Sequence, residues 1–171
     1  MDQRLPMSYV GGALQQVAFV VKNLAAGLKF FNETMGVPRF YVIDDFGNKA
    51  TEKTFRGRPA DHNFKLALAY SGDTQIELIQ HLSGETCYKE FLERRGEGLH
   101  HLGFFLDDAD RYQAALAAFA GAGYPILMSG RFGNTRYTYF DTELAIGSIM
   151  EIVYLDTATK ALMAQIKRGD F

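Results

Sequence analysis

Four polar residues lie in strand-like segments of otherwise apolar sequence, where their side chains can do chemistry. They are Gln16, Glu77, His101 and Glu151. An ionised carboxylate in such a segment needs a cation or a metal as partner, or else its pKa shifts until the group is neutral. An amide, an imidazole and two carboxylates form a mixed nitrogen and oxygen set that suits a divalent metal ion, and the two carboxylates balance its charge. The donors therefore predict one bound divalent ion, and their types do not distinguish Zn, Ni, Co, Mn and Fe.

The alternation of side chains along a strand places these donors on one face of a sheet. Successive residues of a strand point to opposite faces. Because the apolar Val17 marks the face covered by a helix, its neighbour Gln16 points away from that helix. The same parity separates Leu102 from His101 and turns Glu77 away from its apolar neighbours. The donors are thus predicted to share the uncovered face.

The sequence repeats this pattern in its second half. Residues 16–23 and 101–108 align with an offset of 85 positions, and Gly36 and Gly121 keep the same offset. In each half a strand is followed by a helix N-cap, an apolar stripe at helical spacing, a glycine suited to a helix C-terminus and three short strand-like runs. This order predicts two tandem βαβββ modules, an α+β fold in which the paired modules form a cupped mixed sheet around the four donors.

The spacing of these elements divides the chain into four parts. They are a first module, a helical connector, a second module and a C-terminal helix, at residues 14–80, 81–98, 99–155 and 156–171. Residues 44–63 carry balanced charges and little apolar periodicity. We expect this segment to be a solvated loop.

Composition limits the partners. The chain has 171 residues, 47% of them hydrophobic, and 18 Lys and Arg against 20 Asp and Glu give a net charge of -2. That balance provides no electrostatic footprint for nucleic acid or for an anionic membrane. The single cysteine, Cys87, cannot form an intrachain disulfide, and no apolar run is long enough to span a bilayer. We expect a soluble, cytoplasmic protein with a small-molecule partner.

Two stretches of the sequence resemble the vicinal oxygen chelate superfamily, which includes glyoxalase I, methylmalonyl-CoA epimerase, extradiol dioxygenases and bleomycin-resistance proteins. The first stretch runs from 76–80 through 96–104 and is similar to the epimerase pattern, and the second runs from 136–141 to Glu151. The resemblance covers about residues 14–155 and implies the glyoxalase/bleomycin-resistance/dioxygenase fold. It places the family's metal ligands on Gln16, Glu77, His101 and Glu151.

The resemblance also implies a reaction in which the metal chelates two neighbouring oxygens of a substrate. A Lewis acid stabilises an enolate as a proton leaves the adjacent carbon, and Glu151 or Glu77 can act as the base. This predicts an isomerase or lyase that transfers a proton next to a carbonyl or thioester, lactoylglutathione lyase-like or methylmalonyl-CoA epimerase-like. The strand at 64–70 has no carboxylate where the epimerases place a second base, which argues against two-base epimerisation.

Two other functions are open to the same fold. A metal-free binding protein of the bleomycin-resistance type would use the cup to sequester an apolar or aromatic ligand, and the weak ligand Gln16 favours it. An extradiol dioxygenase needs two histidines and one carboxylate, but His101 is the one histidine among the four donors, which argues against this function.

Further residues are candidates for substrate contact. Tyr70, Phe105 and Tyr139 supply aromatic surface, and Arg131, near a glycine-rich turn, can hold a carboxylate or phosphate. Strand parity places His100 on the face opposite to His101, which predicts a surface or packing role.

Family habit implies a homodimer. The sequence leaves open whether the two modules pair within one chain or across a dimer.

Overall fold

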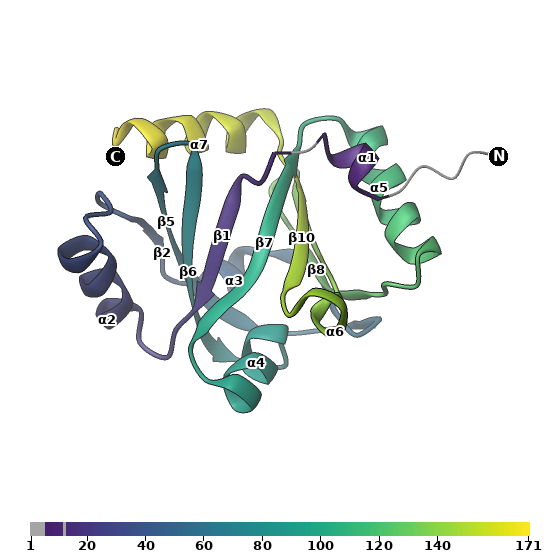
Figure 1. Ribbon diagram of the computed structural model, residues 1–171, viewed down its shortest axis with the longest axis horizontal. Helices are drawn as coiled ribbons and strands as arrows, with labels where there is room; N and C mark the ends of the chain where they lie inside the picture. Colours follow the sequence, from purple (N-terminus) through teal and green to yellow (C-terminus); the bar gives the residue numbers. More distant parts are fainter. Residues whose placement is uncertain (1–5, 12) are drawn as a thin grey trace.

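The computed structural model describes residues 6–11 and 13–171, and its strands form one ten-stranded mixed sheet (Figure 1). The strands are β1 Gln16–Val20, β2 Tyr41–Ile43, β3 Thr51–Phe55, β4 Arg58–Pro59, β5 Asn63–Ser71, β6 Thr74–Ser83, β7 Gly98–Leu106, β8 Ile126–Phe132, β9 Thr135–Phe140 and β10 Ile149–Tyr154. The helices are α1 Met7–Val10, α2 Leu24–Lys29, the π-helix η1 Phe30–Thr34, α3 Phe46–Lys49, α4 Cys87–Arg95, α5 Ala109–Gly121, α6 Glu143–Ile146 and α7 Thr157–Arg168.

The strand order β2-β5-β6-β1-β7-β10-β9-β8-β3-β4 contains the two βαβββ patterns side by side. β1 is parallel to β6, β7 is parallel to β10, and the antiparallel pairing of β1 with β7 joins the two patterns. The predicted α+β fold with a cupped mixed sheet is confirmed. The modules pair within one chain, which answers the question that the sequence left open.

The helix that follows the first strand of each module begins as predicted. The Asn23 side chain accepts a hydrogen bond from the Ala26 amide at 3.0 Å, and Asp108 accepts one from Arg111 at 2.9 Å. Such caps satisfy amides that have no partner inside the helix. The apolar stripes of α2 and α5 then pack against separate clusters on one face of the sheet, opposite to the donors.

The two helices end differently. Gly36 has a φ of 68° and ends the first helical segment as predicted. Gly121 does not play the equivalent part, because α5 continues through it and the left-handed residue is Gly123, with a φ of 86°.

The prediction of a solvated loop at 44–63 is wrong. This segment forms α3, β3 and β4, and β3 pairs with β8 at the edge of the sheet opposite to β2. Its charged residues obscure a few apolar ones that are decisive: Ala50 is buried, and Phe46 stacks on Phe132 with the ring centres 4.9 Å apart. The chain therefore crosses from one edge of the curled sheet to the other and helps to close the cup.

Helix α7 also bridges the two modules. Figure 1 shows it running along one end of the sheet, from the side of β10 towards β5. Lys167 pairs with Asp73 at 2.6 Å, and the Phe171 ring packs edge-on against Tyr41 at 5.4 Å. The C-terminal segment is thus attached to the first module although it follows the second.

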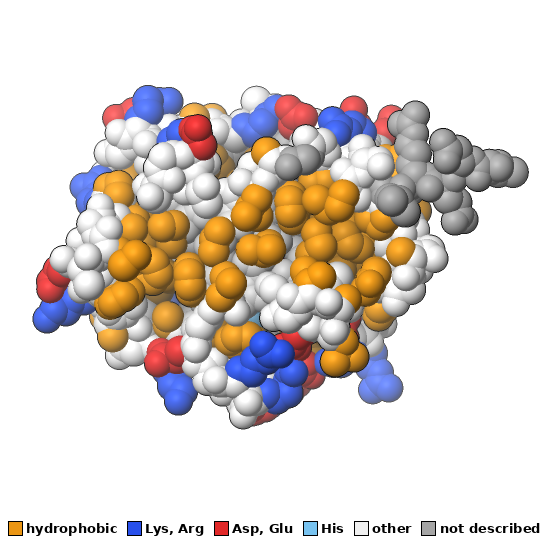
Figure 2. All heavy atoms as spheres, in the orientation of Figure 1, with side chains coloured by type: hydrophobic (Ala, Val, Ile, Leu, Met, Phe, Trp, Pro, Cys, Tyr) orange, Lys and Arg blue, Asp and Glu red, His pale blue; other side chains and the backbone are white. Residues whose placement is uncertain are grey.

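The outer face of the sheet, which is the face opposite to the donors, carries exposed apolar side chains. Figure 2 shows such side chains gathered across the middle of the face on which β1 and β7 lie in Figure 1. Phe30, Met35 and Leu99 are among the large apolar residues that are 45% or more exposed. Within the described residues, no helix combines the length and apolar character needed to cross a bilayer.

His62 provides a test of how the interior responds to acid. It is buried beside Phe64, neither of its ring nitrogens has a hydrogen-bond partner among the described residues, and burial together with Lys53 lowers its pKa to about 4. Its pKa in the unfolded chain is about 6.5, so between these values the unfolded chain binds more protons, and stability falls as the pH falls through this window.

We expect His62→Leu to lose less stability than the unaltered chain between pH 7 and pH 4.5 in urea unfolding. An equal loss in both proteins would contradict this account.

Candidate functional site

The structure brings the four donors together in the cup. The Nε2 atom of His101 lies 3.3 Å from each of three oxygens, Gln16 Oε1, Glu77 Oε2 and Glu151 Oε2. All four residues are buried, with at most 6% of any of them exposed. They come from the adjacent strands β6, β1, β7 and β10, so the centre of the sheet forms the floor of the site.

Strand register explains this convergence. Ala18 of β1 lies between Glu77 of β6 and His101 of β7, and its small side chain leaves the two larger ones room to meet above it. Gly103 pairs with Gln16, and a Cβ atom at Gly103 would lie 2.3 Å from Gln16 Oε1. A glycine at this position therefore makes room for the amide of Gln16.

A β-bulge in β7 changes the orientation of His100. Ala18 pairs with His101 but Phe19 pairs with Leu99, so His100 is an extra residue between them. The two histidines meet through their Nδ1 atoms at 2.9 Å, and both are fully buried. The predicted opposite orientation of His100 is wrong because the bulge breaks the parity on which it was based.

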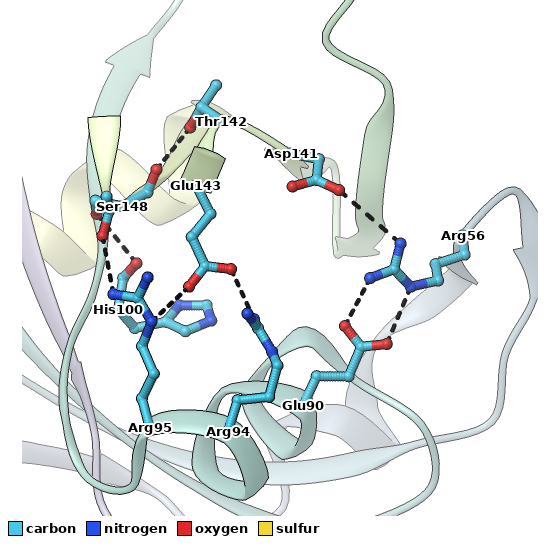
Figure 3. A network of polar contacts seen from close by, with 10 residues as sticks. Arg56, Glu90, Arg94, Arg95, His100, Asp141, Thr142, Glu143 and Ser148 are labelled. Atoms are coloured by element: carbon cyan, nitrogen blue, oxygen red, sulfur yellow. Dashed lines mark hydrogen bonds and ion pairs between the residues drawn. The ribbon is translucent and has the colours of Figure 1, made fainter. Parts of the chain in front are cut away.

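Polar contacts fasten His100 to its surroundings (Figure 3). Ser148 Oγ donates a hydrogen bond to the His100 carbonyl at 3.1 Å. On α4, Arg94 and Arg95 converge on Glu143, at 2.6 and 3.0 Å, which ties the connector helix to the segment that precedes β10. Ser148 thus holds the backbone of the bulge, and the arginine pairs hold the neighbouring elements together.

The site combines one positively charged side chain with two carboxylates. Burial alone would lower the pKa of His101, but Glu151 and Glu77 raise it to about 9, so the ring is an imidazolium in this arrangement. Burial raises the pKa of Glu77, although His101 opposes that shift. The contact with Gln16 Oε1 meets hydrogen-bond geometry, whereas Oε2 of Glu77 and Oε2 of Glu151 are buried and accept no hydrogen bond. One cation therefore faces two carboxylates with unused oxygen atoms.

This donor set fits a divalent ion in its chemistry. Ligands that each lie about 2.0–2.2 Å from one ion are about 3.0–3.4 Å apart, and the separations of 3.3 Å around His101 Nε2 fall in that range. Across residues 6–11 and 13–171, no group of three or more His, Cys, Asp or Glu side chains has a ready-made arrangement for a metal, and the four donors contact one another directly. An ion would replace the proton on His101 Nε2 and give both free carboxylate oxygens a partner.

Gln75 is a site residue that the sequence interpretation missed. Its Oε1 accepts a hydrogen bond from Gln16 Nε2 at 2.8 Å, which directs Gln16 Oε1 towards His101. Gln75 is fully buried, and its own Nε2 donates to Tyr70 Oη and to Met163 Sδ. Strand parity could have identified it, because it lies two residues before Glu77 on the same face.

A cavity of about 70 Å³ lies against the donors, and two of the four predicted substrate residues line it. Phe105 and Tyr139 form part of its wall, and the Tyr139 ring lies 4.9 Å from that of His101. Tyr70 is not part of the lining, because it stands behind Gln75 and holds the amide of that residue.

Arg131 also lies outside this cavity. Its guanidinium donates to the Gly133 carbonyl at 2.7 Å and to Asn134 Oδ1 at 2.6 Å, and it pairs with Glu52. A Cβ atom at Gly130 would meet the Tyr137 ring, so position 130 faces the cup and position 131 faces away from it. Arg131 braces a turn, and the structure does not bring it to the donors.

Residues 15–140 match the family model of the Glyoxalase/Bleomycin resistance protein/Dioxygenase superfamily. The chain belongs to this superfamily. The vicinal oxygen chelate resemblance inferred from the sequence is therefore confirmed. No curated protein matches the sequence.

Solved structures of this superfamily share the fold. Methylmalonyl-CoA epimerase from Mycobacterium tuberculosis has a TM-score of 0.60 at 21% identity, with 86% of this chain and 91% of that chain covered. A variant of the Streptomyces coelicolor epimerase in complex with 2-nitronate-propionyl-CoA has a TM-score of 0.60 at 18% identity, covering 85% and 95%. A hypothetical protein from Bacillus halodurans has a TM-score of 0.57 at 16% identity, covering 84% and 94%. At these identities the likeness is one of fold.

The hydrogen bond between Gln16 and Gln75 can be tested by a double-mutant cycle. We expect Gln75→Leu to lower the free energy of unfolding by about 1–3 kcal/mol, because Gln16 Nε2 is left buried without an acceptor. Combining Gln75→Leu with Gln16→Leu should cost about 1 kcal/mol less than the two single losses together, measured by urea unfolding.

Gln80→Leu is the matched control for this cycle. Gln80 lies on the same strand but accepts from the Leu24 amide, away from the donors, so its loss should add to that of Gln16→Leu. Additive losses for the pair of Gln16 and Gln75 would show that this hydrogen bond does not orient the donor.

Proposed function

We propose that the protein is a divalent-metal-dependent enzyme that transfers a proton at the carbon next to a carbonyl or thioester. The observation that supports this proposal is the convergence of three oxygens on His101 Nε2 at 3.3 Å, where the two carboxylate oxygens have no hydrogen-bond partner among the described residues. Two buried carboxylates that share one counter-ion are costly for a fold that gains nothing else from them. A site that binds a cation accounts for that cost.

The four donors have distinct parts in this proposal. Gln16, Glu77, His101 and Glu151 would hold the ion, which supplies positive charge to stabilise negative charge on the substrate oxygens. Glu77 or Glu151 would then take the proton from the adjacent carbon, by leaving the ion or by leaning away from it. The surrounding apolar residues exclude water, so the charges act at full strength.

The relatives indicate which substrates to test first. Some of the epimerase structures are complexes with methylmalonyl-CoA or with 2-nitronate-propionyl-CoA, which makes acyl-CoA thioesters one class. Glutathione hemithioacetals, which the glyoxalases use, are a second class. Uncharged α-hydroxyketones present the same adjacent oxygens without a charged carrier. No carboxylate lies on β5 between residues 64 and 70, which favours a mechanism with a single base.

Exchange of substrate protons with deuterium oxide tests the proposed chemistry. We expect elemental analysis to find about one divalent ion per chain. We also expect the protein to exchange the α-proton of at least one substrate class in a metal-dependent reaction, which NMR monitors. Glu77→Gln and Glu151→Gln should each leave an amide that cannot take a proton, and loss of the base should slow exchange by about 10²–10⁴-fold. Glu33→Gln, on the exposed surface, is the matched control and should exchange normally.

A second candidate function is a metal-free binding protein, which the apolar cavity and the weak amide ligand Gln16 favour. Protein that contains no divalent ion, takes none up and exchanges no proton would establish this alternative and overturn the enzyme.

We also propose a homodimer. The apolar side chains gathered on the face seen in Figure 2 support a contact surface, since monomeric proteins rarely leave such patches uncovered. Phe30, Met35 and Leu99 are among the exposed large apolar residues of the chain. Light scattering coupled to size-exclusion chromatography should give twice the mass of one chain. A monomer across the concentration range would contradict this.

A further inference from the structure

We propose that the cavity over the donors selects a compact, uncharged apolar body, such as a single ring or a short branched chain. It disfavours substrates that carry negative charge away from their chelating oxygens. This inference rests on the proposed function and names the substrate class of the same site.

The wall of the cavity is almost entirely apolar. Fourteen of its nineteen lining residues are aromatic or aliphatic, including Phe64 from the first module and Phe105 from the second. The other five are three of the donors together with Thr135 and Thr159, whose hydroxyls hydrogen-bond to each other at 2.7 Å. A ligand body therefore meets carbon surface on most sides once its oxygens face the donors.

No lysine, arginine or histidine is among the residues that line this cavity in the described part of the chain. Two cations near the cup pair with carboxylates outside the cavity: Arg131 with Glu52, and Lys167 with Asp73. The charged side chains in the wall are Glu77 and Glu151, which carry the same sign as an anionic ligand. A remote carboxylate or phosphate would lose its hydration here and find no counter-charge, which costs several kcal/mol in an apolar site.

Helix α7 limits the size of the ligand. Leu162 and Met163 form part of the wall, and the helix is fixed at its start by the Asp156 cap and near its end by Lys167. An engineered cavity of about 150 Å³ binds benzene, and the cavity here is about 70 Å³. A single ring thus requires a small outward shift of α7, and a larger body requires a larger shift.

Three hydroxamates with one chelating head group test the preference in cobalt-loaded protein. We expect benzohydroxamate to bind at least about tenfold more tightly than acetohydroxamate, because its ring replaces water on apolar walls. We expect 4-carboxybenzohydroxamate to bind at least about tenfold more weakly than benzohydroxamate, because its carboxylate is buried unpaired. Equal affinities for the two ring probes, or for the ring and methyl probes, would overturn the inference.

Two lysine substitutions test whether α7 forms the part of the wall that disfavours a negatively charged ligand. Leu162→Lys places a cation in the lining at a half-buried position and should improve binding of the carboxylated probe relative to benzohydroxamate. Ala161→Lys adds the same charge at an exposed position of the same helix and should leave the ratio unchanged. An unchanged ratio in both variants would show that α7 does not face the ligand.

Metal-free protein separates this inference from the proposed function. With [¹³C]methyl-methionine labelling and Met163→Leu to assign the signal, benzyl alcohol should shift the Met163 methyl resonance and benzoate should not. If this holds in a protein that never binds metal, the enzyme proposal fails and the cavity preference stands. If metal binds but benzoate shifts Met163 as much as benzyl alcohol does, the preference fails and the enzyme proposal stands.

Discussion

Two carboxylates buried around one imidazole are the constraint on which the rest of the structure depends. Removing either charge from water is expensive, and the free energy is recovered only if the partners stay in place. Glu77 and Glu151 both lie 3.3 Å from His101 Nε2, so a small displacement of this one ring leaves both without their counter-ion. The buried hydrogen bonds from Gln16 to Gln75 and between the two histidines help to hold this position.

The antiparallel pairing of β1 with β7 makes that arrangement possible. It joins the two modules at the point where each contributes its first strand, so donors from both halves meet in the middle of the sheet. A slip of one residue between these strands would turn one set of donors to the opposite face. Ala18 and Gly103 sit in this seam, and their small size leaves the space that the amide and the imidazole occupy.

Sequence reasoning succeeded where the chain follows a simple period. Strand parity predicted that Gln16 and His101 lie on the same face, and the repeat predicted two βαβββ modules. It failed at His100, because a bulge depends on pairing with a distant strand, and at Arg131, whose partners belong to a local turn. It also failed over 44–63, where charged residues outnumber the few apolar ones that dock at the far edge of the sheet. Gln75 shares a face with Glu77, as parity along the strand indicates, but its role rests on the hydrogen bond from Gln16, which the sequence does not show.

The floor and the wall of the cup have different origins in the chain. The duplicated strands supply every donor, whereas Phe46 of α3 and the Leu162 and Met163 side chains of α7 come from segments that have no counterpart in the other half. The four donors are thus fixed by the central register, whereas much of the cavity wall lies on elements added around it. The two parts meet at Met163, whose Sδ accepts a hydrogen bond from Gln75 beside the donors. Under the proposed function, changes in α3, or in α7 away from Met163, would alter the size and polarity of the cavity while the reaction centre is retained.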